Sequence, residues 1–345
     1  MIKKRGKLKK VIRQLSKIVR KRFALLEKRK QLSKVHDITH VTVVSICARE
    51  VAKRLAKGLE NSDTIADYAE IAGLLHDIVR KATERELHGP LGAKVLQRYA
   101  RMFPHMFKGI SEEALNKILD VVRIHELSLG EIEREIKNWP KEWQIVARAV
   151  VIGDKLIEAS GERVIERRAF FVGNERLHRG DLQYLKKIYG KKAPLYAVAM
   201  ECCMRLRARN IIKNYPKKFQ PIVRRLHAIQ EEFYLGLLRY LNLTEDALFE
   251  EMERIDFPMF NRYKNILKKE IMTAKSENRI KNLDNDIAES AAEWVMHFSK
   301  VESPEEAIRT FKPKGKKAKE WLKVVKSFRA RDINLISKKI DELFK

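Results

Sequence analysis

The stretch Ala69-Glu70-Ile71-Ala72-Gly73-Leu74-Leu75-His76-Asp77 decides how this chain folds, because an apolar run ends in a histidine and an aspartate. The run predicts a buried helix over about 64–75 that ends at this pair. An imidazole and a carboxylate adjacent at a helix end can both turn toward one divalent metal ion. Alone the pair is weak support for such a site, since a helix cap or a solvated pair is its ordinary alternative.

Other residues of the same chemistry lie on both sides of this pair, inside or beside apolar periodic stretches. His40 precedes it, whereas His88, His125 and Asp154 follow it. Imidazole suits Fe, Mn, Co, Ni or Zn, and such ions activate water for hydrolysis. The sequence therefore predicts a hydrolytic metal centre, with the ligand candidates His40, His76, Asp77, His88, His125 and Asp154.

Three of the nearby histidines have competing interpretations. His88 could cap the helix that begins at Pro90, and His125 could be a core histidine. His36 precedes His40 by one helical turn, but a helix start near Asp37 favours contact with substrate or with a ligand over direct ligation.

Helical periodicity extends over most of the chain, and no run of alternating residues predicts a sheet, although 163–172 could pair locally. The expected fold class is therefore all-α. We expect a basic amphipathic helix over 1–34, a metal-site domain over 35–215, a helical C-terminal region over 216–311 and a basic tail over 312–345.

Charge is concentrated at the two ends of the 345-residue chain, whose net charge is +27. Residues 1–34 carry fifteen Lys/Arg against Glu27 alone, and residues 312–345 carry twelve against four acids. Such ends suit a nucleic-acid backbone, and Trp321 within the second adds a base-stacking candidate. Contact with an anionic membrane surface and a solvated, stabilising surface are the alternatives.

The chain also excludes several classes of protein. Cys47, Cys202 and Cys203 form no CxxC pair, which argues against a zinc ribbon or a disulfide framework and favours a reducing, cytoplasmic setting. No apolar stretch is long enough to span a bilayer, and we expect no signal peptide. A Walker loop, a Rossmann glycine fingerprint and a GxSxG elbow are all absent from the sequence.

The order of the six ligand candidates resembles that of the HD-domain superfamily of metal-dependent phosphohydrolases. The local sequences agree in His40-Val41-Thr42-Val43-Val44, in Ala72-Gly73-Leu74-Leu75-His76-Asp77-Ile78 and in His88-Gly89-Pro90-Leu91-Gly92-Ala93. The resemblance covers about residues 36–165. It looks closest to the bacterial HD enzymes that split symmetrical dinucleoside tetraphosphates with a di-iron centre.

The resemblance implies a helical domain around two metal ions, with iron or manganese preferred over cobalt, nickel or zinc. One ion would be held by His40, His76, Asp77 and Asp154, and the other by His88, His125 and the shared Asp77. His76 and Asp77 would be central to catalysis. Where family members often have a lysine, this chain has Arg80 followed by Lys81. The candidates for contact with substrate are Arg80, Lys81, Lys155, Arg163 and His36.

The leading functional hypothesis is a metal-dependent phosphohydrolase that cleaves an ester or anhydride of a nucleotide or another phosphorylated small molecule with activated water. The first alternative is an RNA nuclease or cyclic-phosphate phosphodiesterase that holds nucleic acid with its basic ends. The second is a non-catalytic nucleotide- or RNA-binding protein with a structural metal site. The sequence does not indicate an oligomeric state.

Overall fold

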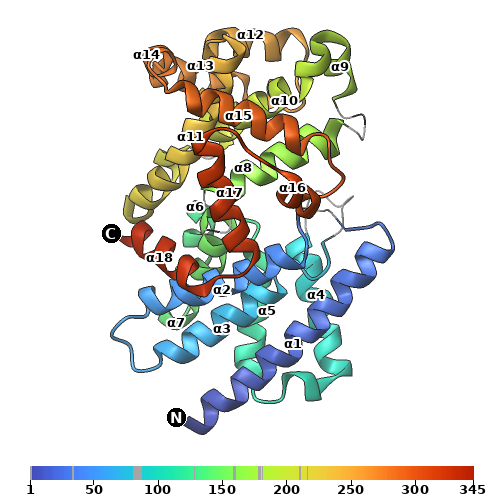
Figure 1. Ribbon diagram of the computed structural model, residues 1–345. Helices are drawn as coiled ribbons and strands as arrows, with labels where there is room; N and C mark the ends of the chain where they lie inside the picture. The colour runs from blue at the N-terminus through green and yellow to red at the C-terminus, as the bar shows by residue number, and fades with distance from the viewer. Residues whose placement is uncertain are drawn as a thin grey trace. The chain divides into compact units, whose positions relative to one another are not determined.

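The structure is a computed structural model that describes residues 2–32, 35–80, 88–127, 129–157, 161–177, 180, 182–209, 211–215 and 217–345. Within these ranges the chain is helical and contains no β-strand, apart from one isolated bridge between Lys108 and Ile110 (Figure 1). The predicted all-α fold class is confirmed. None of the described helices is long and apolar enough to cross a membrane.

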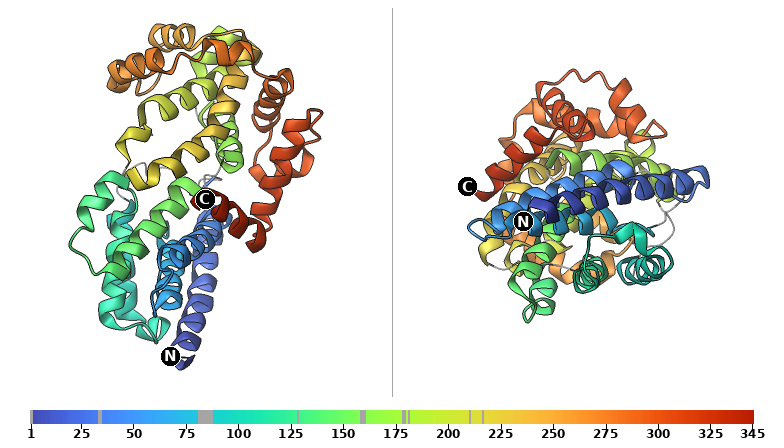
Figure 2. Two further views of the ribbon diagram at one scale, coloured as in Figure 1. Left: turned by 90° about the vertical axis from the view of Figure 1, so that its left-hand side faces the viewer. Right: turned by 90° about the horizontal axis from the view of Figure 1, so that it is seen from below.

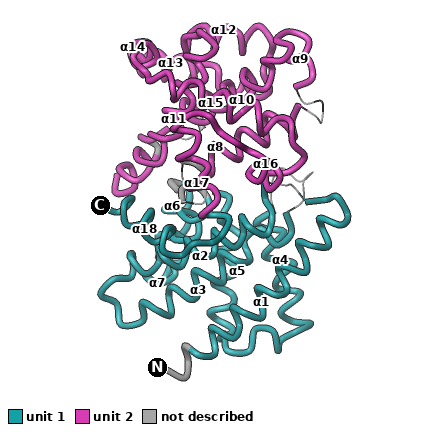
Figure 3. Tube along the Cα trace, viewed as in Figure 1, with its two compact units in different colours: residues 1–159, 328–345 teal, residues 160–327 magenta. Residues whose placement is uncertain are grey.

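Two compact units make up the chain, and each combines residues in a way that the sequence analysis did not expect (Figure 3). The first contains Met1–Ala159 and Phe328–Lys345, and the second contains Ser160–Ser327. The expected boundary near 215 is therefore wrong, as is a separate segment over 312–345. The reason is that no Gly/Ser/Pro linker marks the change of core.

The first unit is built around α2 (Ile38–Leu55) and α3 (Ser62–Leu75), which pack closely against each other. This pair contacts α1 (Ile2–Lys28), α5 (Glu112–Ile124), α7 (Lys141–Val151) and α18 (Ile333–Phe344). Helix α4 (His88–Met102) packs against α5, and α6 (Leu129–Glu135) packs against α7. A 3-10 turn, Pro104–Phe107, follows α4, and a π-helical turn, Ile152–Ile157, follows α7.

Two glycines allow α2 to approach its neighbours closely. A Cβ at Gly73 of α3 would lie 3.0 Å from the Cα of Ser45, and one at Gly153 would lie 3.1 Å from the backbone nitrogen of Ala48. Glycine is suited to such close backbone approach because it has no side chain to displace. Helix α2 therefore contacts both the end of α3 and the π-helical turn, the two segments that carry His76-Asp77 and Asp154.

Helix α1 is amphipathic as predicted, and its apolar stripe belongs to the core of the first unit. Leu8, Val11, Leu15, Val19 and Phe23 are each no more than 1% exposed. The helix packs along α3 and touches α2 (Figure 2), and most of its described lysines and arginines are exposed, whereas Arg22 is half-buried. Helix α1 is thus part of the folded core as well as a source of positive charge.

The second unit has a separate core around α11 (Gln220–Leu241) and α15 (Asn285–Phe298). The other α-helices of this unit are α8 (Gly161–Phe170), α9 (Gln183–Tyr189), α10 (Ala193–Met204), α12 (Glu245–Arg254), α13 (Phe260–Ala274), α14 (Glu277–Lys281), α16 (Pro304–Thr310) and α17 (Lys316–Arg329). The local strand pairing considered for 163–172 is wrong, because α8 and a π-helical turn, Phe171–Arg176, occupy this segment.

The predicted basic tail is largely helical, since it contains α17 and α18. Trp321 of α17 is only 2% exposed, with its ring centroid 5.6 Å from that of Phe233 and 5.9 Å from that of Trp294. Ile336 and Ile340 of α18 are fully buried, and α18 packs against α2 of the first unit. Trp321 is therefore a core residue, and the idea that it stacks on a nucleic-acid base is wrong.

Candidate metal centre

Helix ends place all six predicted ligands in one cluster within the first unit. His40 lies in the first turn of α2, where Asp37 caps the helix by accepting a 2.8 Å hydrogen bond from the backbone nitrogen of His40. His76 and Asp77 directly follow α3, and His125 directly follows α5. The remaining two ligands are His88, the first residue of α4, and Asp154 of the π-helical turn. Single π-helical turns occur frequently at functional sites.

One half of the cluster contains His40, His76, Asp154 and one oxygen of Asp77. The His40 Nε2 lies 3.3 Å from the His76 Nε2, 3.3 Å from the Asp77 Oδ2 and 3.4 Å from the Asp154 Oδ1. The His76 Nε2 lies 3.4 Å from the same Asp77 oxygen. Donor atoms that surround one ion at about 2.1 Å are roughly 3.0–3.4 Å apart. These four groups therefore have the spacing of ligands around a single ion.

The other half contains His88, His125 and the second oxygen of Asp77. The His88 Nε2 lies 2.8 Å from the Asp77 Oδ1 and 3.1 Å from the His125 Nε2, which is itself 3.6 Å from that oxygen. Imidazole nitrogens therefore surround both buried oxygens of Asp77. The two oxygens of Asp77 thus face different histidines, which is the arrangement expected of a carboxylate that bridges two cations.

Backbone carbonyls set the tautomers of two of these histidines. The Nδ1 of His76 lies 2.7 Å from the carbonyl oxygen of Gly73, and the Nδ1 of His125 lies 2.7 Å from that of Val122. Because a carbonyl oxygen only accepts, each Nδ1 carries the hydrogen and donates it. The Nε2 lone pairs of both histidines are consequently directed into the cluster, as metal ligation requires.

Glu126 is a candidate functional residue that the sequence analysis missed. Its Oε1 lies 2.5 Å from the Nδ1 of His88, and its Oε2 accepts a 2.7 Å hydrogen bond from the backbone nitrogen of Gly89. Metal-binding histidines commonly donate their second N–H to a carboxylate in this way. The only available signal was the position of this acid directly after His125.

Electrostatics within the cluster show that it attracts positive charge. Burial alone would lower the pKa of His76, but the charge and hydrogen bond of Asp77 and the charge of Asp154 raise it to about 9. Burial alone would raise the pKa of Asp77, yet His76 and Arg80 bring it well below its ordinary range. Two ionised carboxylates, of which Asp77 is fully buried, need cationic partners, which protons or metal ions can supply.

Of the five predicted substrate-contact residues, the structure brings two to the cluster. The Nη1 of Arg80 lies 3.6 Å from the Asp77 Oδ2 and 3.4 Å from the His88 Nε2, with 27% of the side chain exposed. The ring centroid of His36 is 5.2 Å from that of His40. Lys81 lies outside the described residues, as does the side chain of Lys155.

Arg163 differs from the expectation of a phosphate contact. It belongs to α8 of the second unit, is 1% exposed and pairs with Glu166 on the same helix.

Comparisons with protein-family models, with curated proteins and with solved structures gave no match to this chain. The likeness to HD-domain phosphohydrolases therefore stays a prediction.

Proposed function

We propose that the protein is a metal-dependent hydrolase of phosphate esters or anhydrides, and that its substrate is a nucleotide or a similar phosphorylated small molecule. One observation carries the proposal: the Nε2 atoms of four histidines all lie within 3.6 Å of an oxygen of Asp77, two on each side of its carboxylate. Iron, manganese or another divalent transition metal suits this donor set, and when bound it activates water and screens phosphoryl charge.

The residues of the chain have distinct parts in this proposal. Asp77 would hold both ions, while Asp154 and His40 complete the first half and His88 and His125 the second. Asp154 and Arg80 are the partly exposed members, with side-chain exposures of 18% and 27%. Substrate therefore reaches the centre on their side. The guanidinium of Arg80 can bind two phosphoryl oxygens at once, which orients the phosphate toward the ions.

Metal analysis and a substrate panel test the proposal together. Protein purified without chelators is expected to carry one or two transition-metal ions and to hydrolyse one or more of nucleotides, dinucleoside polyphosphates and short RNAs with Fe, Mn, Co or Ni. The variant Asp77→Asn should lose metal and activity. The matched control is Asp120→Asn on α5, whose carboxylate lies at the surface 3.5 Å from Lys117. Full metal content and activity in Asp77→Asn would refute the bridging role.

RNA is a second candidate substrate class, favoured by the exposed face of α1. Lys9, Lys10, Arg13, Lys17 and Lys21 are all exposed on this helix. Such cations would bind a single strand with an affinity that falls with salt, by a log–log slope of roughly 0.7 per phosphate neutralised. Glutamine in place of Lys9 and Lys10 should then reduce that slope without changing hydrolysis of a mononucleotide. Binding that is independent of salt would exclude this role.

A further inference from the structure

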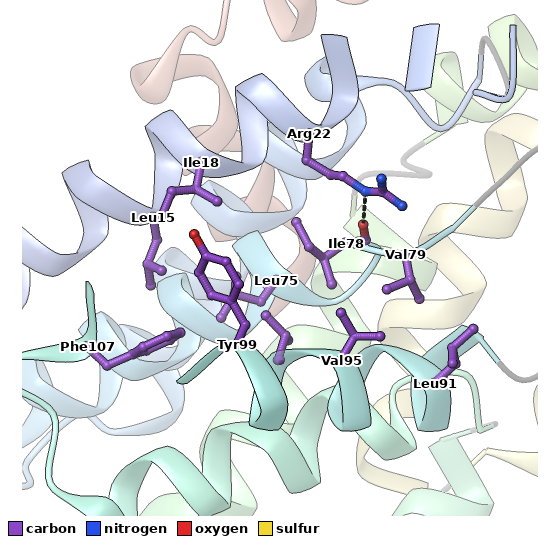
Figure 4. Close-up of a pocket in the computed structure, with 11 residues that line it drawn as sticks. Leu15, Ile18, Arg22, Leu75, Ile78, Val79, Leu91, Val95, Tyr99 and Phe107 are labelled. Carbon is purple, nitrogen blue, oxygen red and sulfur yellow. Dashed lines mark hydrogen bonds between the residues drawn. The ribbon is translucent and has the colours of Figure 1, made fainter. Parts of the chain in front are cut away.

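An apolar cavity of about 270 Å³ lies in the first unit, between α1, the end of α3 and α4 (Figure 4). Leu15 and Ile18 of α1 form one wall, and Leu91, Val95 and Tyr99 of α4 form the opposite wall. None of the six predicted metal ligands lines it. The cavity is therefore separate from the metal centre, although Leu75 and Ile78, which flank His76-Asp77 in the sequence, lie at its base.

The α4 wall of the cavity is open to solvent. Leu91 is 45% exposed and Val95 is 43% exposed, even though both side chains line the cavity. Large aliphatic residues on a helix are normally buried when the helix has a complete partner. A concave apolar surface that stays open in this way is typical of a ligand site.

Arg22 is the one charged residue in the lining of this cavity. Its Nε donates a long hydrogen bond of 3.5 Å to the carbonyl oxygen of Ile78, and no described carboxylate pairs with its charge. Figure 4 shows its guanidinium beside Ile78, above Val79. A half-buried cation next to an apolar cavity lowers the free energy of an anion bound there, because such charges are normally paired.

We propose that this cavity binds an anionic amphiphile, in which an aliphatic chain occupies the space between α1 and α4 and a carboxylate or phosphate head pairs with Arg22. An apolar cavity of about 150 Å³ holds one benzene molecule. The cavity of about 270 Å³ therefore suits an alkyl chain of roughly eight to ten carbons. The head group supplies a negative charge to Arg22, which pairs with no carboxylate of the described residues.

Size and charge together favour this occupant over a partner helix or a second copy of the chain. A stable protein interface buries about 800 Å² on each partner. The cavity is instead lined by only eleven residues, whose polar side-chain groups are the guanidinium of Arg22 and the hydroxyl of Tyr99. One cation at the side of an apolar space matches a ligand with one anionic end.

Calorimetric titration of the full-length, metal-loaded protein with free ligands tests this proposal. The probes are alkyl carboxylates and alkyl phosphates of six to fourteen carbons, kept below their micelle concentrations, and the matching alkanols. Affinity should rise about fourfold per added methylene until the cavity is filled near ten carbons. The acids should bind more tightly than the alkanols by about tenfold, the effect expected of one charge-assisted hydrogen bond.

Two variants test separately how the apolar lining and the charge of Arg22 contribute to ligand affinity. Arg22→Gln should remove the tenfold advantage of the anionic ligands and leave the alkanols unchanged, whereas Lys21→Gln, the exposed neighbour, should change neither. Val95→Trp should fill the cavity and abolish binding of all probes, with metal content and thermal unfolding monitored as folding controls. If Val95→Trp unfolds, Leu91→Trp at the same open wall takes its place.

Vesicles of phosphatidylglycerol distinguish a free ligand from a membrane surface. Binding of free decanoate or decyl phosphate that responds to Arg22→Gln supports a ligand cavity. Vesicle binding that survives both cavity variants, with no binding of free ligand, would overturn it in favour of surface attraction by the cations of α1. The absence of saturable binding of any probe would overturn it as well.

Discussion

Replacing Glu126 by glutamine should weaken metal binding at one half of the cluster and spare the other. The carboxylate of Glu126 contacts the Nδ1 of His88 at 2.5 Å and the backbone nitrogen of Gly89 at 2.7 Å. Both contacts need an acceptor, because both partners donate a hydrogen. Glutamine keeps one acceptor oxygen, but its amide nitrogen would face the other donor, and the negative charge is lost.

The expected size of the effect follows from the role of the carboxylate. Burial would raise the pKa of Glu126, but hydrogen bonds from His88 and Gly89 lower it to about 2, so the group is ionised at neutral pH. Loss of such a partner of a metal-binding histidine typically reduces metal affinity by about 10–100-fold. Because both the charge and one hydrogen bond are lost, we expect about 50-fold, or roughly 2.3 kcal/mol at about 1.4 kcal/mol per tenfold change.

Competition with a chelator measures the two binding steps separately. The metal affinity of the step assigned to His88 and His125 should fall by about 50-fold. The metal affinity of the step assigned to His40 and Asp154 should change by no more than about threefold. The control is Glu135→Gln, since Glu135 pairs with Arg123 at the surface, at 2.9 Å. Unchanged affinity for both ions would refute the orienting role of Glu126. Equal weakening of both steps would refute the division into two halves.

Three further predictions concern stability and chemistry. Glu201 is buried, and although burial alone would raise its pKa, Arg205, Arg168 and Arg176 lower it to about 2 from an ordinary 4.5. The stability that Glu201 contributes is therefore present above pH 4.5 and is lost as the pH falls toward 2. Between these pH values, the free energy of unfolding of Glu201→Gln should depend less on pH than that of the unchanged protein. At neutral pH the free energy of unfolding of this variant should be lower by about 3–5 kcal/mol, because the guanidinium groups lose their shared carboxylate. An unchanged denaturant midpoint would contradict this prediction. Phe23→Ala in α1 should cost about 3–5 kcal/mol in urea unfolding, compared with about 0.5 kcal/mol or less for the exposed Arg20→Ala. If both cost the same, α1 is not part of the core. In water labelled with heavy oxygen, the phosphate product of hydrolysis should contain one labelled oxygen, and isolation of a phosphorylated side chain would exclude direct attack by water.

Residue type and local periodicity were sufficient for the fold class and for the choice of ligand candidates. The apolar run that ends at His76-Asp77 forms α3 as expected, because helix formation depends on neighbours a few residues apart. The amphipathic pattern of 8–26 likewise predicted α1. Histidines and aspartates at the ends of such helices can be recognised from the sequence because the helices themselves can be predicted.

The tertiary structure alone decided how these residues are combined. The ligands lie on the two sides of Asp77 because several helix ends meet there. These ends are as far apart in sequence as His40 and Asp154, and no local rule relates their positions. Glu126 acquires its role only because α4 and α5 meet at Gly89. The burial of Trp321 and the change of core between residues 159 and 160 depend in the same way on contacts between distant segments. Periodicity indicates which face of a helix is buried, but the partner that covers this face is selected by packing across the whole chain.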